Sequence, residues 1–177
     1  MKLYQSVGPN PRTVKMFIAE KGLDVARVDI DLMGVFYAMK HQLPAMEKQH
    51  RANGRGGTIV NIASVAGLAG AARLSVYAAA KHGVVGLTRS AASEYATRGI
   101  RVNAVCPSFA RTSMVGDFVK LAGGKEADAH AELTRGVPMK RVAEVDEVVE
   151  VILFAADPKN SFMTGHTLSV DGGIMAI

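Results

Sequence analysis

Short apolar runs alternate with longer, helix-patterned segments along the 177 residues of the chain. The β-branched runs 57–64 and 100–108 predict buried strands, and the apolar–polar alternation of 26–32 predicts a half-buried one. With two shorter candidates, the predicted strands cover 2–6, 26–32, 57–64, 100–108 and 166–173. The predicted helices cover 11–22, 34–50, 75–99 and 144–157. This alternation predicts an α/β fold, with a parallel sheet of about five strands and helices on both faces.

The composition is that of a globular domain with an aliphatic core, because 49% of the residues are hydrophobic and there is no Trp. The sequence shows no leader-like apolar region, no run long enough to cross a bilayer, and a single cysteine, Cys106. We therefore expect a cytoplasmic protein with no membrane partner. The net charge of +5 comes from scattered basic residues without interleaved aromatics, which argues against a nucleic-acid partner. The five histidines lack metal-ligand spacing, so we predict no metal site.

Tyr77 and Lys81 are the first candidate functional residues. Because they stand four residues apart on a predicted helix, they share one face and lie about one turn apart. A positive charge about 4 Å from a tyrosine hydroxyl favours its ionised form by about 4 kcal/mol at an effective dielectric of about 20. Ser64 ends the predicted strand 57–64, at the sheet edge where ligands bind in open α/β folds. Spacing alone leaves open a packed tyrosine beside a surface lysine, because Tyr-x-x-x-Lys arises readily by chance.

The sequence around that pair favours the catalytic interpretation. The stretch "GGTIVNIASVAGLAGAARLSVYAAAKHG", the later "GIRVNAVCPS" and the closing "TGHTLSVDGG" follow in this order, and Ser64 stands 13 residues before Tyr77. In these motifs, residues 34–177 resemble the short-chain dehydrogenase/reductase family, whose domain is Rossmann-like. The resemblance implies that Tyr77 is the general acid/base, that Lys81 holds the nicotinamide ribose, and that Ser64 orients the substrate oxygen.

The same resemblance implies a cofactor, a substrate class and an assembly. The reaction would be hydride transfer between NAD or NADP and a small alcohol or ketone, in a homo-oligomer (dimer or tetramer). The stretch "CPSFARTSM" resembles the family segment along the cofactor, so Pro107 and Thr112 join Tyr77 and Lys81 as expected cofactor-binding residues. Ser108 stands where the family usually has glycine. Residues 112–137 correspond to the variable substrate lid of the family.

The front of the chain departs from that family. The family's T-G-x-x-x-G-x-G turn, which cradles the cofactor pyrophosphate, is absent from the sequence. Residues 1–32 instead resemble the opening β-α-β of a glutathione transferase, in which "NPRTVKMFIAEKGL" is the first helix and its approach. We therefore predict that segments 1–32 and 33–177 pack as one domain. In it, 26–32 pairs beside 57–64 and 2–6 lies outside it, which makes an incomplete Rossmann-like sheet of about five strands.

Asp31 is a second departure, because family members commonly have a catalytic asparagine three residues before the glycine that matches Gly34. A carboxylate there adds a negative charge near Lys81.

Three functions stay open. The preferred one is an NAD(P)-dependent oxidoreductase with a Ser-Tyr-Lys site. A fusion or fragment with weak or lost cofactor binding would act as an oligomerising partner, and a glutathione-binding module would use Ser6 or Asn10.

Overall fold

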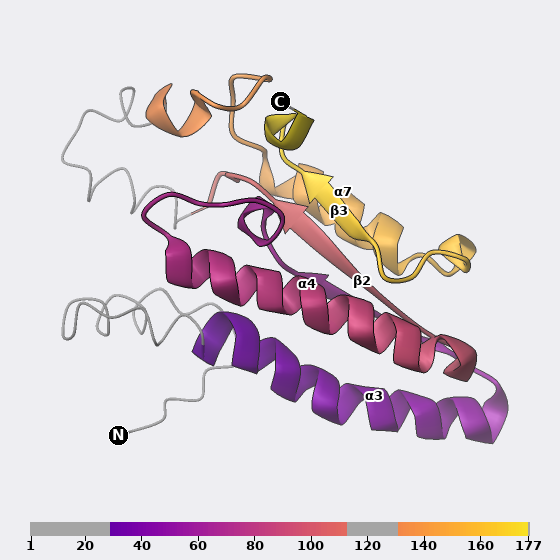
Figure 1. Cartoon of the computed structure of the whole chain (residues 1–177). Helices are drawn as coiled ribbons and strands as arrows, with labels where there is room; N and C mark the ends of the chain where they lie inside the picture. Colours follow the sequence, from indigo (N-terminus) through magenta and orange to yellow (C-terminus); the bar gives the residue numbers. More distant parts are fainter. Residues whose placement is uncertain (1–28, 113–130, 177) are drawn as a thin grey trace.

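The computed structural model describes residues 29–112 and 131–176 (Figure 1). Three sequence predictions therefore lie outside the described residues: the strand 2–6, the helix 11–22 and most of the lid segment 112–137. The division of the chain into segments 1–32 and 33–177 likewise depends on residues outside this range.

The described part of the chain has a three-stranded sheet. Its strands are β1 (Gly57–Ile62), β2 (Ile100–Pro107) and β3 (Thr167–Val170), in the order β1-β2-β3. All pairs are parallel: the β1–β2 ladder starts at Gly57 opposite Ile100, and the β2–β3 ladder starts at Ala104 opposite Thr167. These strands confirm three of the predicted ones and the parallel α/β fold.

Helices cover both faces of this sheet, as predicted (Figure 1). Helices α3 (Gly34–Asn53) and α4 (Ser75–Tyr95) pack side by side on one face, and α7 (Val145–Ala156) covers the other. Glycines in the left-handed region follow the first two helices: Gly54 has φ 70° after α3, and Gly99 has φ 68° after the short 3₁₀ turn that ends α4. Such residues end helices because glycine carries no Cβ.

Strand β2 is buried on both faces, which explains its near-continuous apolar sequence. Ile100 and Val102 face α3 and α4 in one cluster of buried residues, and Cys106 belongs to a second cluster on the same face. Arg101 points to the other face, where its guanidinium donates hydrogen bonds to carbonyls of the α7 C-terminal end and to Thr58 Oγ1. Arg101 thereby satisfies carbonyls that the end of a helix leaves unpaired.

The predicted strand 26–32 is wrong over its described residues. Asp29–Met33 form the π-helical turn η1, which runs directly into α3, so that no strand pairs with β1 there. The alternation of apolar residues has another cause. Leu32 packs against the buried cluster of α4 and β2, while Asp31 pairs with Lys81. Within the described residues the sheet therefore has three strands rather than about five, with β1 at one edge.

Candidate active site

Ser64 lies just beyond β1, at the carboxyl edge of the sheet. Its Oγ accepts a hydrogen bond from the Ala66 amide at 3.2 Å, which caps the 3₁₀ turn η2 (Val65–Gly67). The same Oγ donates to the Pro107 carbonyl at the end of β2, at 3.4 Å. Ser64 is buried. Its hydroxyl is therefore held at the carboxyl ends of two neighbouring parallel strands, where open α/β sheets bind ligands.

Tyr77 and Lys81 occupy the first two turns of α4, as their spacing predicts. The Lys81 Nζ lies 5.6 Å from the centroid of the Tyr77 ring. Tyr77 is half-buried, whereas Lys81 is only 8% exposed. Lysines are rarely buried this deeply unless their charge is paired. The two side chains are thus close enough for the ammonium to act on the phenol electrostatically.

Two groups hold the Lys81 ammonium. Its Nζ donates a hydrogen bond to the Ile62 carbonyl, at 3.2 Å, at the end of β1. The Asp31 Oδ1 lies 3.4 Å from the same nitrogen and forms an ion pair with it. The expectation that a carboxylate at position 31 adds a negative charge near Lys81 is therefore confirmed. Through these two contacts Lys81, on α4, connects to η1 and to the end of β1.

Gly67 is a site-forming residue that the sequence analysis missed. A Cβ at this position would lie 2.7 Å from the Lys81 carbonyl oxygen and 2.8 Å from its carbonyl carbon. The turn that Ser64 caps is therefore pressed onto the backbone of the helix that carries Lys81. A larger residue would push the two apart. The run of small residues after Ser64 is the sequence signal, but it does not say which glycine makes the contact.

Cys106 lies beneath this edge of the sheet and is fully buried. Burial raises the pKa of its thiol, and the opposing influences of Ser64, Arg89 and Lys81 only partly offset this. A thiol that stays neutral is a poor nucleophile. Cys106 is therefore a core residue rather than a candidate nucleophile.

Pro107 and Thr112, the other predicted cofactor-binding residues, differ in whether they contact Ser64. Pro107 ends β2 and accepts the Ser64 hydrogen bond, so the structure brings it to the site. Thr112 is exposed, and its hydroxyl donates to the nearby Ala110 carbonyl at 3.4 Å, within its own loop. The structure therefore joins Pro107, but not Thr112, to the Ser64 turn.

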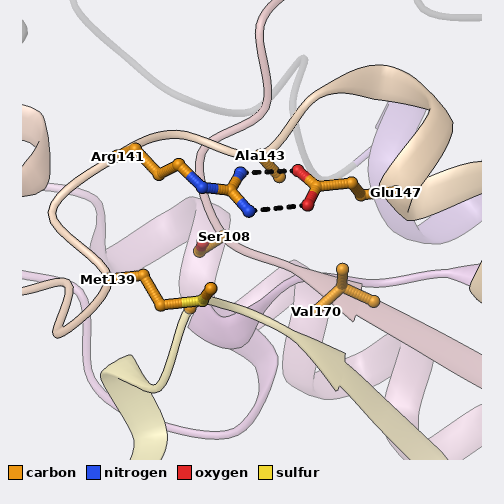
Figure 2. Close-up of a pocket in the computed structure, with 7 residues that line it drawn as sticks. Ser108, Met139, Arg141, Ala143, Glu147 and Val170 are labelled. Carbon is orange, nitrogen blue, oxygen red and sulfur yellow. Dashed lines mark hydrogen bonds and ion pairs between the residues drawn. The ribbon is translucent and has the colours of Figure 1, made fainter.

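A small cavity of about 110 Å³ lies beyond β2 and β3, next to Ser108 (Figure 2). Two hydrogen bonds of 2.6 and 2.7 Å join Arg141 to Glu147 across its wall. The Arg141 guanidinium lowers the pKa of Glu147 to about 2, and the carboxylate in turn raises the pKa of Arg141. The charges at this cavity thus neutralise each other. Its volume is well below the roughly 300 Å³ at which ligand pockets begin.

The described part of the chain offers neither a metal-ligand cluster nor a membrane-spanning helix. Among the described residues, no three His, Cys, Asp or Glu side chains gather in a way that could hold a metal ion. No helix within the described ranges has both the length and the apolar character that a membrane crossing requires.

Comparison with known proteins identifies the lineage of this arrangement. The family model described as enoyl-(acyl carrier protein) reductase matches residues 5–175. A cyclohexanol dehydrogenase of Acinetobacter sp. (strain SE19) is 41% identical over 145 residues, which is 82% of this chain and 52% of that protein. A cis-4-hydroxycyclohexanecarboxylate dehydrogenase of Sinomonas cyclohexanicum is 43% identical over 159 residues, which is 88% of this chain and 59% of that protein.

A solved structure also matches this chain in both fold and sequence. The structure titled "ElxO with NADP Bound" is 34% identical, has a TM-score of 0.73, and is matched over 83% of this chain and 56% of its own. The chain thus spans little more than half the length of these proteins. None of the comparisons supports the likeness of residues 1–32 to a glutathione transferase, and the family match already begins at residue 5. The chain belongs to the short-chain dehydrogenase/reductase family.

Proposed function

We propose that this chain acts as an NAD(P)-dependent oxidoreductase, transferring hydride between the cofactor and a small alcohol or ketone. One observation carries the proposal. The turn capped by Ser64 packs directly against the turn of α4 that carries Lys81, and Tyr77 lies one helical turn before it. A hydroxyl, a phenol and a buried ammonium are the groups that proton transfer to or from a substrate oxygen needs.

Each of the three residues has a distinct role in this proposal. The Ser64 hydroxyl, held in place by its hydrogen bonds to Ala66 and Pro107, orients the substrate oxygen. Tyr77 gives a proton to that oxygen during reduction and takes it back during oxidation. Lys81, whose Nζ lies 5.6 Å from the centroid of the Tyr77 ring, holds the nicotinamide ribose and brings a positive charge close to the reacting groups.

The donors of this chain fit the nicotinamide–ribose part of NAD(P)(H). A lysine ammonium offers three N–H donors and a tyrosine offers one O–H, both suited to ribose hydroxyls. When bound, the cofactor supplies or accepts the hydride, and the protein positions the reacting groups. In this proposal Pro107 and Thr112 flank the cofactor. The solved relative with NADP bound supports the cofactor class without deciding between NAD and NADP for this chain.

Names of the relatives suggest the substrate class. Two of them are dehydrogenases named for cyclohexanol and for a hydroxycyclohexanecarboxylate. We therefore propose a cyclic secondary alcohol, or its ketone, as the substrate, and a homo-oligomer as the working assembly.

Cofactor titration and a single variant test the proposal. The full chain is titrated with NADH and NADPH by cofactor fluorescence, and turnover is followed with cyclohexanol and NAD⁺ or NADP⁺. Tyr77→Phe should lower kcat by about 10²- to 10⁴-fold, because it removes the proton-transferring hydroxyl. Tyr37→Phe, which alters an exposed tyrosine of α3, is the matched control and should leave kcat unchanged. No saturation at millimolar cofactor would favour the impaired fragment, and full turnover by Tyr77→Phe would refute the assigned role.

A further inference from the structure

The surroundings of the Lys81 ammonium carry a further inference, which rests on the proposed function. The Lys81 side chain is 10% exposed, and the Asp31 carboxylate, 23% exposed, lies 3.4 Å from its Nζ. The same nitrogen donates to the Ile62 carbonyl at 3.2 Å. One of the three N–H donors of the ammonium is thus used by the protein itself, and an opposing charge lies beside the same nitrogen. Whatever else approaches Lys81 must compete with the carboxylate.

The backbone holds Asp31 in this position. The π-helical turn η1 runs without a break into α3, and Leu32 packs against α4. A Cβ on Gly83 would lie 2.8 Å from Leu32 Cδ1, so the turn sits directly against the helix at that glycine. Lys81 precedes Gly83 by two residues, about half a turn of α4. Asp31, the neighbour of Leu32, is therefore held beside Lys81. Single π-helical turns are uncommon and often occur at functional sites.

We propose that Asp31 is a positioning residue that limits how strongly Lys81 binds the cofactor. Its carboxylate neutralises part of the ammonium charge and lies beside the nitrogen that a ribose hydroxyl would approach. An asparagine at position 31 has nearly the same size and keeps an oxygen in its side chain, but it removes the negative charge. NAD(P)(H) is itself an anion, so the loss of that charge favours its binding. The natural site therefore binds the cofactor more weakly than the same site with a neutral residue 31.

Cofactor affinity tests this directly. The dissociation constants of NADH and NADPH are measured by fluorescence titration of the full chain, with and without the substitution. Asp31→Asn should lower Kd by about 3- to 10-fold, the size of effect expected when one partly buried charge near a ligand is removed. Glu150→Gln removes an exposed carboxylate on α7 and is the matched control for net charge. It should leave Kd within about 2-fold, because exposed distant charges are screened.

A second measurement tests the ion pair without any cofactor. Urea unfolding is compared for the wild type, Asp31→Asn, Lys81→Met and the double variant. Asp31→Asn should lower the urea midpoint when Lys81 is present, because a buried charge loses its partner. In the Lys81→Met background the same substitution should leave the midpoint unchanged or raise it. Equal losses in both backgrounds would show that the two side chains do not interact, and would overturn the inference.

The binding outcomes separate this inference from the proposed function. Tighter binding by Asp31→Asn supports it, since a residue with a merely structural role would weaken binding or leave it unchanged when replaced. Binding by the wild type that Asp31→Asn does not tighten overturns this inference alone. Failure of both proteins to bind either cofactor overturns the proposed function as well.

Discussion

The contact between Gly67 and the α4 backbone predicts a large effect for a single added methyl group. An alanine Cβ would lie 2.7 Å from the Lys81 carbonyl oxygen, whereas ordinary contact begins at 3.4 Å. The two atoms nearest to the added methyl group, the Lys81 carbonyl oxygen and carbon, belong to the backbone and cannot rotate away. The turn and the helix must therefore separate by about 0.7 Å. Overpacking of this kind costs about 1–3 kcal/mol of the free energy of unfolding. The displacement also moves Ser64 relative to Tyr77, and should lower kcat by about 10- to 100-fold.

Gly70→Ala is the matched control for this prediction. Gly70 lies in the same loop, is exposed, and has nothing within 4 Å of its added Cβ. It should change the free energy of unfolding by no more than about 0.5–1 kcal/mol, in either direction. Urea unfolding and steady-state turnover of both variants measure the two effects. A Gly67→Ala protein as stable as Gly70→Ala would refute the close packing. A loss of stability without a loss of kcat would show that the contact does not position the site.

Two further predictions concern charged groups away from the site. Arg101→Ala should lower the free energy of unfolding, measured with urea, by about 2–4 kcal/mol, because it removes the hydrogen bonds to the α7 carbonyl groups. The control Arg51→Ala, at an exposed arginine, should cost less than about 0.5 kcal/mol. Equal losses in the two variants would contradict the capping role of Arg101. The depressed pKa of Glu147, about 2 against a usual 4.5, adds stability that is full above pH 4.5 and is lost as the pH falls through 2. Glu147→Gln should therefore lower Tm by about 1–3 °C at neutral pH, and a scan in which this gap persists at pH 2 would contradict the assignment.

Much of the fold follows from local patterns in the chain. The β-branched runs at 57–62 and 100–107 are both strands, as predicted. The second is buried because apolar side chains on both faces suit a parallel sheet covered by helices, whereas β1, at the edge, is only partly buried and exposes Ile62. The long helix ends near Gly99, where a left-handed residue is required. Residues four apart lie on the same side of any α-helix, so Tyr77 and Lys81 share one side of α4. Their catalytic roles stay predictions.

Local pattern failed at residues 29–33. The alternation there is compatible with a strand, but Leu32 and Asp31 are set by contacts with α4, which lies far along the chain. Such contacts override local preference because burial and ion pairing act wherever the chain folds back. The apolar pattern of 26–32 could not reveal that its partner was a helix.

By itself, the sequence determined the alternation of strands and helices, the parallel sheet, and the helical spacing of the Tyr-Lys pair, because each depends on residues near one another in the chain. The family resemblance predicted that Asp31 lies near Lys81. Only the tertiary structure decided that Asp31 does so from a π-helical turn, that Gly67 lies against the Lys81 backbone, and that Arg101 caps α7. These contacts join segments whose approach depends on how whole elements pack. Ångström-scale fit between distant backbones leaves no mark on local periodicity.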